Sequence, residues 1–553
     1  MADERGESFL GPIFRRREQA APDSTSTPEP AAPAAPPQPA TPPQTTGFDP
    51  TVFKPLARPF APPAPAKPAF EPMTMLQSWS QEGDGFRIAD ALTGVAVFGA
   101  TGSGKTSGPA RHLASGYLRA GFGGLVLCAK KEERRQWEQW ADAAGRTDDL
   151  VIIDAAGNWR FNFLDWEARR PGEGGGLTVN IVALLDEIAG AIAGAAGKGE
   201  GSGDAKFFND ALHHMNTNLV ELPVYAGLPL TLPLMRSIVT TAPQSLHQAA
   251  DEEWQRTSIC AALLREAEKV VADADEEVKA DFEECRNYWT QEFPALSEKT
   301  RSIIVLSFGM LVRPFLTRPL RKLFATDTNV QPETTFEGKI IIVDLAIQEF
   351  RLAGRVANLA WKYCFQVAVL RRTPPAEGYL RPVFLWADEA QNFVTEYDAE
   401  FQAVARSAGG CTVYLTQNRE SYRRVLGNDD TVDALLGNLQ AKFFCQNTGE
   451  TNEWAAKLLG EQWVKVENSS SGLNPLGGIG GSGGIGKGML SSLSMGSSTT
   501  EQRRFLVEPS QFTTLSRGGP KGNYRVEAIV YNGGHIFSGT KQAYTVLAIN
   551  QRG

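Results

Sequence analysis

From about residue 85, short apolar runs alternate with amphipathic stretches along the chain. Three of the early runs are apolar at successive positions: LTGVAVFGA, GGLVLCA and DLVIIDAA. The stretches between them, SGPARHLASGYLRAGF and ERRQWEQWADAAG, carry apolar residues three and four positions apart, which is the spacing of an amphipathic helix. Strands that are apolar on both faces are typical of a parallel sheet covered by helices. The pattern therefore predicts an α/β fold.

The pattern changes in the middle of the chain and then returns. Residues 181–325 lack clear strands and carry long helical patterns such as CAALLREAEKVVADADEEVKADFEECRNYW. Strand-like runs resume with GKIIIVDLA, PVFLWADEA, GCTVYLTQ and AKFFCQ, and end with RVEAIVY and AYTVLAI. We therefore expect residues 76–180 and 326–553 to form one α/β domain, with residues 181–325 as an all-α insertion.

Two segments have the composition of unfolded chain. More than half of the 34 prolines lie in residues 1–72, and we predict a disordered Pro-rich tail over residues 1–75. This tail is either a plain linker or a tether to a partner or membrane complex. Residues 469–500 are rich in glycine and serine, and we predict a mobile loop there.

The composition is that of a globular protein and excludes several classes. Hydrophobic residues make up 42% and charged residues 21% of the 553 positions, and no apolar run is long enough for a membrane-spanning helix. The first residues do not resemble a secretory signal, and the six cysteines are dispersed, which indicates a reducing cytoplasm rather than a disulfide scaffold. The net charge of −8 excludes a wholly basic nucleic-acid coat, although basic doublets such as Lys130-Lys131 could contact DNA phosphates or simply be solvated.

The strongest local motif is GATGSGKT, which matches G-x-x-x-x-G-K-[ST] between a predicted strand and a predicted helix. In such a loop, the backbone N–H groups and the helix N-terminus bind phosphate oxygens. Lys105 is expected to reach the β- and γ-phosphates of ATP, and Thr106 to bind Mg²⁺. The alternative is a plain glycine turn. The candidate nucleotide-binding residues are Gly99, Thr101, Gly102, Ser103, Gly104, Lys105, Thr106 and Ser107.

Polar side chains at the ends of two later strands complete a candidate catalytic site. Asp388 follows the run PVFLWA and is expected to hold Mg²⁺, and Glu389 is expected to act as general base on the attacking water. Gln417 ends GCTVYLTQ and is a candidate sensor of the γ-phosphate. Arg406 is a candidate for stabilising charge on a neighbouring subunit's phosphate. Strand-end caps and a solvated arginine are the alternatives.

These ordered motifs resemble the TraG/TraD coupling-protein family of type IV secretion systems. The resemblance covers about residues 85–465 and is carried by GATGSGKT, LVLCAKKEERRQW, FLWADEAQNF, VARSAGGCTVYLTQN and LLGNLQAKFFCQNTGETNEWAAKLLG. The chain departs from the family where Cys128 and Ala129 precede Lys130, where Phe163 follows Asn162, and where a Pro-rich tail replaces the usual membrane-spanning helices.

The resemblance implies a RecA-like P-loop NTPase that packs as a hexameric ring, hydrolyses ATP with Mg²⁺ and passes DNA, which we take to be single-stranded. It also implies that a relaxase or relaxosome and the components of a type IV secretion channel are partners. We expect a cytoplasmic protein without an autonomous transmembrane anchor, peripheral at most to the cytoplasmic face of the inner membrane. The alternatives are a nucleotide-regulated receptor for protein cargo and a DNA pump like FtsK or HerA.

Overall fold

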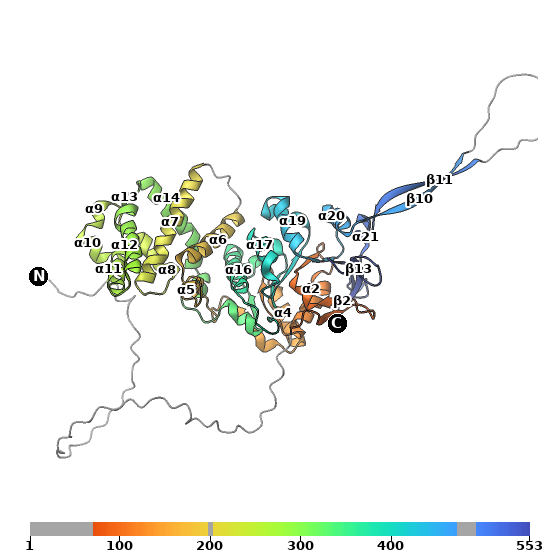
Figure 1. Ribbon diagram of the computed structural model, residues 1–553, viewed down its shortest axis with the longest axis horizontal. Coiled ribbons are helices and arrows are strands. Elements are labelled where there is room, and N and C mark those ends of the chain that lie inside the picture. Colours follow the sequence, from red (N-terminus) through yellow and green to blue (C-terminus); the bar gives the residue numbers. More distant parts are fainter. Residues whose placement is uncertain (1–69, 197–202, 473–493, 553) are drawn as a thin grey trace, which may run out of the picture. The chain divides into compact units, whose positions relative to one another are not determined.

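The computed structural model describes residues 70–196, 203–472 and 494–552 (Figure 1). Almost all of the predicted Pro-rich tail lies outside these residues. The described chain begins at Phe70, whose ring centroid lies 6.4 Å from that of Phe122 in the hydrophobic core. Strands β1 (Met75–Ser78) and β2 (Gly85–Arg87) then form a small antiparallel sheet. The folded region thus begins ahead of the first strand that the apolar pattern predicted.

Among the described residues, the main sheet has nine strands in the order β13-β12-β9-β3-β8-β7-β4-β6-β5. Their bounds are β3 (Val95–Phe98), β4 (Gly123–Leu127), β5 (Leu150–Ile153), β6 (Ile340–Val343), β7 (Val383–Ala387), β8 (Gly410–Thr416), β9 (Ala441–Phe444), β12 (Arg525–Asn532) and β13 (Tyr544–Asn550). All pairings from β9 to β5 are parallel, whereas β12 pairs antiparallel with both β9 and β13. The α/β class with a parallel sheet is confirmed, and the C-terminal strands add an antiparallel edge.

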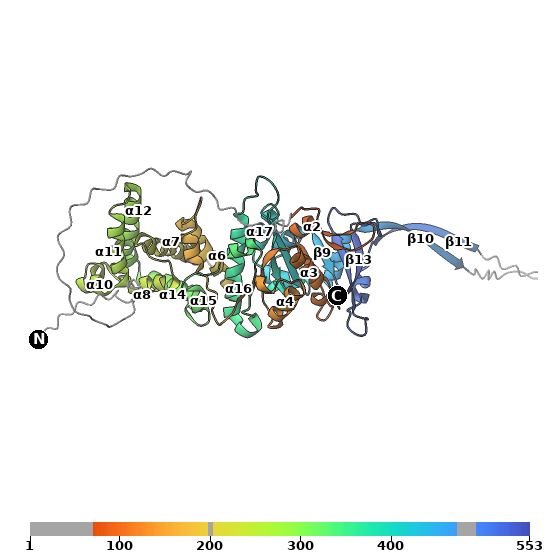
Figure 2. The same ribbon diagram turned by 90° about the horizontal axis from the view of Figure 1, so that it is seen from below.

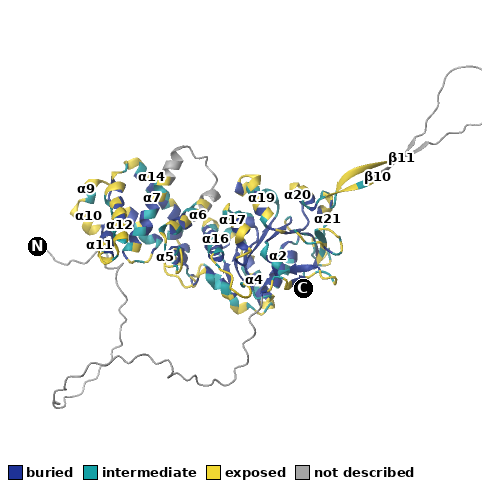
Figure 3. Cartoon of the chain, in the orientation of Figure 1, coloured by how far each residue is buried: buried dark blue, intermediate teal, exposed yellow. Residues whose placement is uncertain are grey.

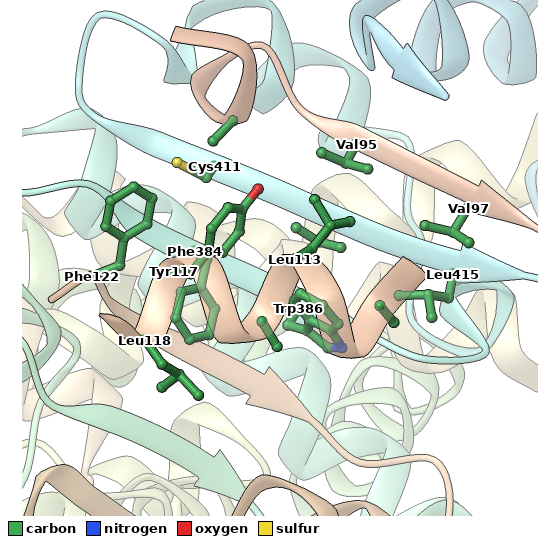
Figure 4. Close-up of a cluster of buried hydrophobic side chains, with 14 of the residues drawn as sticks. Val95, Val97, Leu113, Tyr117, Leu118, Phe122, Phe384, Trp386, Cys411 and Leu415 are labelled. Carbon is green, nitrogen blue, oxygen red and sulfur yellow. The ribbon is translucent and has the colours of Figure 1, made fainter. Parts of the chain in front are cut away.

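Helices cover both faces of this sheet. The flanking helices are α3 (Arg111–Arg119), α4 (Glu132–Ala143), α16 (Ile347–Leu370) and α17 (Tyr397–Ala405). Leu113 and Tyr117 of α3 belong to the same buried cluster as Leu415 of β8 (Figure 4). Val413 of β8 is a further member of this cluster. The intervening Tyr414 points to the opposite face and donates its hydroxyl hydrogen bond to Asp398 of α17 over 2.7 Å. Helices α16 and α17 lie side by side in both views (Figures 1 and 2).

Between β5 and β6 the described residues form helices and no strand. These are α5 (Phe163–Ala168), α6 (Thr178–Ala196), α7 (Gly203–Tyr225), α8 (Leu232–Thr241), α9 (Leu246–Ala249), α10 (Glu252–Thr257), α11 (Ile259–Val271), α12 (Glu276–Asn287), η3 (Tyr288–Glu292), α13 (Phe293–Ala295), α14 (Glu298–Val312), η4 (Arg313–Leu316), α15 (Leu320–Phe324) and η5 (Pro332–Glu337). The long helical pattern at residues 260–289 is interrupted before α12, where Asp275 accepts a hydrogen bond from the Val278 N–H as an N-cap. The division into domains at residues 181 and 325 stays a prediction.

One ion pair joins the start of this helical region to α16. The Arg371 guanidinium donates two hydrogen bonds to the Glu167 carboxylate, of 2.6 and 2.9 Å. A second contact to α16 is made by Phe161, whose ring centroid lies 4.5 Å from that of Trp361. Paired guanidinium hydrogen bonds fix orientation as well as distance. The chain therefore leaves the sheet after β5 with a defined contact to the helix that follows β6.

The remaining described elements are helices and the strands β10 and β11. They are α2 (Ile88–Leu92), η1 (Thr106–Ala110), η2 (Thr147–Asp149), η6 (Ala390–Asn392), α18 (Arg419–Leu426), α19 (Asp429–Asn438), α20 (Glu450–Leu459), β10 (Glu461–Gly472), β11 (Ser494–Phe505) and α21 (Pro509–Thr514). No helix within the described ranges is both long and apolar enough to cross a bilayer.

The glycine- and serine-rich segment is only partly the loop that we predicted. Residues 469–472 and 494–500 lie in β10 and β11, which pair in antiparallel register from Glu461 with Phe505 to Gly472 with Ser494. The prediction of a loop is therefore wrong at both ends of the segment, because backbone pairing between strands does not require apolar side chains. Residues 473–493 lie outside the described residues. Trp463 of β10 is 67% exposed. Figure 3 shows the described parts of β10 and β11 as largely exposed.

Candidate functional site

The loop GATGSGKT lies between β3 and η1, as the sequence predicts, and its glycines are required by its shape. Gly102 and Gly104 have φ values of +73° and +85°, which side-chain-bearing residues rarely adopt. A Cβ atom on Gly99 would lie 2.3 Å from Ser103 Oγ, and one on Gly104 would lie 2.5 Å from a methyl group of Val526. The loop therefore curls tightly, with no room for a larger residue at Gly99 or Gly104, whereas at Gly102 the backbone angle alone favours glycine.

Several hydrogen-bonding groups of this loop have no partner within the described chain. The backbone N–H groups of Gly102, Gly104 and Lys105 donate to no described acceptor. The hydroxyl of Ser103 is buried and also unpaired among the described residues. Buried polar groups in proteins are normally hydrogen-bonded, and N–H groups that converge ahead of a helix bind anions. The hydroxyl of Ser103 and the N–H of Lys105 belong to buried residues and so lack a partner in the part of the chain that the structure describes, whereas Gly102 is exposed to solvent. A phosphate would supply acceptors for these groups.

Two stretches of chain that are far apart in sequence meet at this loop. Thr106 Oγ1 donates a 2.8 Å hydrogen bond to Asp388 Oδ2, and Lys105 Nζ lies 3.4 Å from Glu389 Oε1. Both acids follow β7, and β7 is separated from β3 in the sheet by β8 alone. The carboxyl ends of parallel strands lie at one edge of a sheet, so the loop after β3 and the acids after β7 share that edge.

Two glutamines contact Oε2 of the Glu389 carboxylate, the oxygen that Lys105 does not approach. Gln391 Nε2 donates to Glu389 Oε2 over 2.9 Å, and Gln417 Nε2 lies 3.5 Å from the same oxygen. Gln391 is held in turn by Thr416, whose hydroxyl donates to Gln391 Oε1 over 2.9 Å. Gln417 follows β8, the strand between β3 and β7. The structure therefore brings Gln417 into the cluster, and it adds Gln391, which the sequence analysis did not single out.

Lys130 is a further member of the site, which the sequence analysis named only in a basic doublet and in a departure from the family pattern, without a role in the site. Its Nζ atom lies 2.7 Å from Glu389 Oε1 and 3.9 Å from Asp388 Oδ2. The lysine follows β4, which is the neighbour of β7 on the side away from β8. The signal that could have identified it is this position directly after a buried strand. Its neighbour Lys131 faces solvent and pairs with Glu349 instead.

The two lysines determine the ionisation of Glu389. Burial alone would raise the pKa of this carboxyl, but the charge of Lys105, together with hydrogen bonds from Lys130 and Gln391, lowers the pKa to about 2. Burial alone would lower the pKa of Lys130. The negative charges of Asp388 and Glu389 have the larger effect and raise this pKa. Glu389 is thus an ionised carboxylate held between cations.

A further carboxyl group, that of Glu133, contacts the loop that carries Lys130. Glu133 of α4 is buried, its Oε2 accepts a 2.8 Å hydrogen bond from the Ala129 N–H, and its Oε1 has no partner among the described residues. Burial, followed by the negative charge of Asp388, raises the pKa of Glu133 well above its usual value. Through this hydrogen bond, Glu133 holds the backbone of the loop after β4 in place.

The structure does not bring every predicted residue into the cluster. Arg406 is exposed at the end of α17, and its guanidinium makes no hydrogen bond or ion pair within the described ranges. Its expected role at a neighbouring subunit stays a prediction. Thr101 is exposed, and the Ser107 hydroxyl already accepts a 2.6 Å hydrogen bond from Gln551 Nε2, near the C-terminal end of the described chain. The nucleotide-binding roles of Thr101 and Ser107 also stay predictions.

The donor set has the chemistry of a metal–triphosphate site. A hydroxyl and a carboxylate, on Thr106 and Asp388, are the oxygen ligands that Mg²⁺ prefers in proteins. An ammonium group on Lys105 and the unpaired N–H groups of the loop suit phosphate oxygens. An ionised carboxylate on Glu389, with an amide on Gln417 beside it, can accept a proton from water and orient it. The arrangement is thus suited to hydrolysis of a nucleoside triphosphate.

Comparison with known proteins agrees with the resemblance seen in the sequence. Residues 382–517 match a family model described as the TraM recognition site of TraD and TraG. The TraG/TraD-like character of the chain is thus confirmed over this segment. Comparison with curated protein sequences found no match.

Solved structures with the same fold come from conjugative coupling proteins. The bacterial conjugative coupling protein TrwBdeltaN70 in its unbound form is 15% identical, with a TM-score of 0.54, over 86% of this chain and 88% of that chain. The plasmid coupling protein TrwB in complex with the ATP analogue ADPNP is 14% identical, with a TM-score of 0.53, over 86% and 89%. TrwB in complex with ADP and Mg²⁺ is 14% identical, with a TM-score of 0.52, over 86% and 88%. At this level of identity the likeness shows the fold, and the RecA-like P-loop class is confirmed.

Proposed function

We propose that this chain is an ATPase that acts as a coupling protein, recruiting relaxase-bound conjugative DNA and translocating it to a type IV secretion channel. The observation that carries the enzymatic part is the convergence of Lys105 and Thr106 with Asp388 and Glu389 at one edge of the sheet. The likeness to coupling proteins supports the biological part. TrwB has been solved with ADPNP and with ADP and Mg²⁺, which supports the same ligands here.

Each residue has one role in this reaction. The Lys105 ammonium and the loop N–H groups bind phosphate oxygens and so position the triphosphate. Thr106 and Asp388 hold Mg²⁺, which neutralises charge on the transferring phosphoryl group when bound. Glu389 accepts a proton from the attacking water, and Gln417 orients that water.

The assembly and partners of the protein belong to the same proposal. A hexameric ring would place the exposed Arg406 of one copy where it can face the nucleotide of the next, which a single chain cannot achieve. DNA, which we take to be single-stranded, would pass through such a ring, and the relaxosome and the channel would be the partners at its two ends. The protein would act in the cytoplasm or at the cytoplasmic face of the inner membrane.

The experiment that tests this proposal measures ATP turnover with and without single- and double-stranded DNA, together with the oligomer mass. We expect turnover that requires Mg²⁺, increases with DNA and accompanies a ring-sized oligomer. No turnover under any of these conditions would contradict the enzymatic part. Turnover that is unchanged by DNA but increases with a relaxosome protein would contradict DNA translocation, while the ATPase activity would stand.

A second candidate, a nucleotide-regulated receptor for protein cargo, is favoured by a groove in the helical region. The groove has a volume of about 470 Å³ and lies between α8 and α14, where Val239, Leu306 and Met310 line it and Arg236 and Arg313 flank it. Leu306 and Met310 are 63% and 62% exposed. Neither arginine forms an ion pair with any described residue. This surface suits a protein segment that carries apolar and acidic side chains.

The two candidates differ in what stimulates hydrolysis. If the protein is a receptor that binds its cargo in the groove, Leu306→Asp should weaken cargo binding. A translocase responds to DNA regardless of this substitution. Binding of a cargo protein that is lost in Leu306→Asp, combined with turnover insensitive to DNA, would favour the receptor.

A further inference from the structure

We propose that Lys130 is a positioning residue, which holds the Glu389 carboxylate in place for its reaction with water. This inference rests on the proposed ATPase function and deepens it. Lys130 is the nearer of the two lysines to this carboxylate, because its Nζ lies 2.7 Å from Glu389 Oε1, against 3.4 Å for Lys105. It reaches Glu389 from β4, on the opposite side from the phosphate loop.

The two lysines cannot keep equal roles once a triphosphate is bound. Lys105 belongs to the phosphate loop, and its ammonium is the group expected to contact the β- and γ-phosphates. A lysine that turns toward phosphate oxygens gives up part of its contact with Glu389. Lys130 lies on a different loop and can keep its contact. It is therefore the cation that remains on the general base during the reaction.

The loop that carries Lys130 is held firmly on both sides. The Cys128 N–H donates to Asn358 Oδ1 over 3.0 Å, and the Ala129 N–H donates to Glu133 Oε2 over 2.8 Å. The Gln348 N–H donates to the Ala129 carbonyl over 3.2 Å. Hydrogen bonds from α4 and α16 thus fix the backbone directly before Lys130. A positioning group needs such a rigid base.

Glu389 itself needs to be held. Its φ of +53° is in the left-handed region, which a residue with a side chain adopts only when its surroundings impose it. The carboxylate has a different partner on each oxygen: the lysines contact Oε1, and Gln391 donates to Oε2. Fixing both oxygens sets the plane of the carboxylate, and a misplaced base loses much of its catalytic effect.

The first test compares steady-state ATP turnover of the full chain with Lys130→Met, Lys130→Arg and the control Lys131→Met. Lys131 is the adjacent lysine, but its side chain is 74% exposed and pairs with Glu349, whereas that of Lys130 is 32% exposed. We expect Lys130→Met to lower kcat by about 10- to 100-fold while the Kd of a fluorescent ATP analogue changes less than about twofold. Lys130→Arg should recover part of kcat, and Lys131→Met should behave like wild type.

The second test needs no activity. A double-mutant cycle of Lys130→Met and Glu389→Gln is measured on the thermal unfolding of the nucleotide-free protein. We expect the two changes to be non-additive in the melting temperature, because each removes the same contact. Additive effects would overturn the contact.

The outcomes separate this inference from the proposed function. Wild-type protein without any ATP turnover would contradict the ATPase proposal, and the melting cycle would still test the contact. Normal turnover of wild type and Lys130→Met alike would overturn the positioning role alone. An increase in Kd with kcat unchanged would also overturn it, because Lys130 would then bind nucleotide. If Lys130→Met fails to fold, Lys130→Arg and Lys130→Gln provide the same comparison.

Discussion

Thr106 and Asp388 are joined by a 2.8 Å hydrogen bond although 282 positions separate them in the chain. This contact ties the end of the phosphate loop to the end of β7. It brings together two oxygen groups of the kind that bind Mg²⁺, one on each of the two segments. The expected behaviour of variants at this site follows from it.

Lys105→Ala should lose most nucleotide binding. The substitution removes the ammonium group that faces the loop and leaves Glu389 with Lys130 as its close cation. A charge-assisted hydrogen bond contributes about 1.5–3 kcal/mol, so the Kd for ATP should rise by about 10- to 150-fold in a fluorescence titration. Lys131→Ala, which removes an exposed lysine of the same type, should bind normally. Equal affinity of Lys105→Ala and wild type would exclude Lys105 from phosphate binding.

Glu389→Gln should bind ATP yet hydrolyse it slowly. Glutamine keeps the size of the side chain but cannot accept a proton, and general-base catalysis contributes about 10²- to 10⁴-fold to such reactions. The variant should therefore retain the Kd of wild type and lose kcat by a factor in that range in a phosphate-release assay. Wild-type turnover of Glu389→Gln would show that another group removes the proton.

Arg406→Ala should impair turnover without weakening folding or nucleotide binding. The side chain is exposed and makes no hydrogen bond or ion pair within the described residues, so its removal leaves the subunit intact. An arginine that stabilises the reaction from a neighbouring subunit accounts for about 10³-fold or more of kcat. Mixtures of Arg406→Ala with Lys105→Ala subunits should regain part of the activity, because each supplies what the other lacks. Arg256→Ala, another exposed arginine, is the control and should remain active in unmixed form.

Lys442→Met should stabilise the protein below about pH 8. Lys442 is buried in β9, its Nζ donates to the Leu439 carbonyl over 2.5 Å, and burial lowers its pKa to about 8 from an ordinary 10.5. Below pH 8 both the folded and the unfolded chain carry the proton, and the folded chain bears the cost of a buried charge. Between pH 8 and 10.5 the folded chain releases its proton first, so this cost disappears as the pH rises.

Urea unfolding at pH 7 and pH 10 measures this effect. A shift of this size corresponds to a stability difference on the order of 3 kcal/mol between Lys442→Met and wild type at pH 7. The difference should shrink at pH 10. Lys457→Met, at an exposed position of α20, should show neither the gain nor its pH dependence. An equal gain at both pH values would show that packing rather than charge is responsible.

Much of the fold could be predicted from local sequence. Runs such as VAVF and IIIV are apolar at every position, which predicts strands buried on both faces, and the structure buries each of these residues. The four-residue spacing of apolar positions such as Leu113 and Tyr117 likewise predicted a helix that covers them. The phosphate loop GATGSGKT could also be predicted from sequence, because Gly102 and Gly104 have backbone angles that few other residues adopt. Asp388, Glu389 and Gln417 could be nominated because each follows a buried apolar run. These features depend only on neighbours a few positions away in the chain.

The rest was decided by tertiary structure. Whether Lys130 or Lys131 faces Glu389 depends on β4 lying beside β7, and strand order is set by packing between distant segments rather than by local pattern. The same is true of β12, which joins the sheet antiparallel to β9, and of Gln551, whose side chain hydrogen-bonds to Ser107. Polar strands such as β10 gave no apolar periodicity to detect. Sequence thus determined which elements and chemical groups this protein has, and only the folded chain, by bringing strand ends to one edge, determined which groups act together.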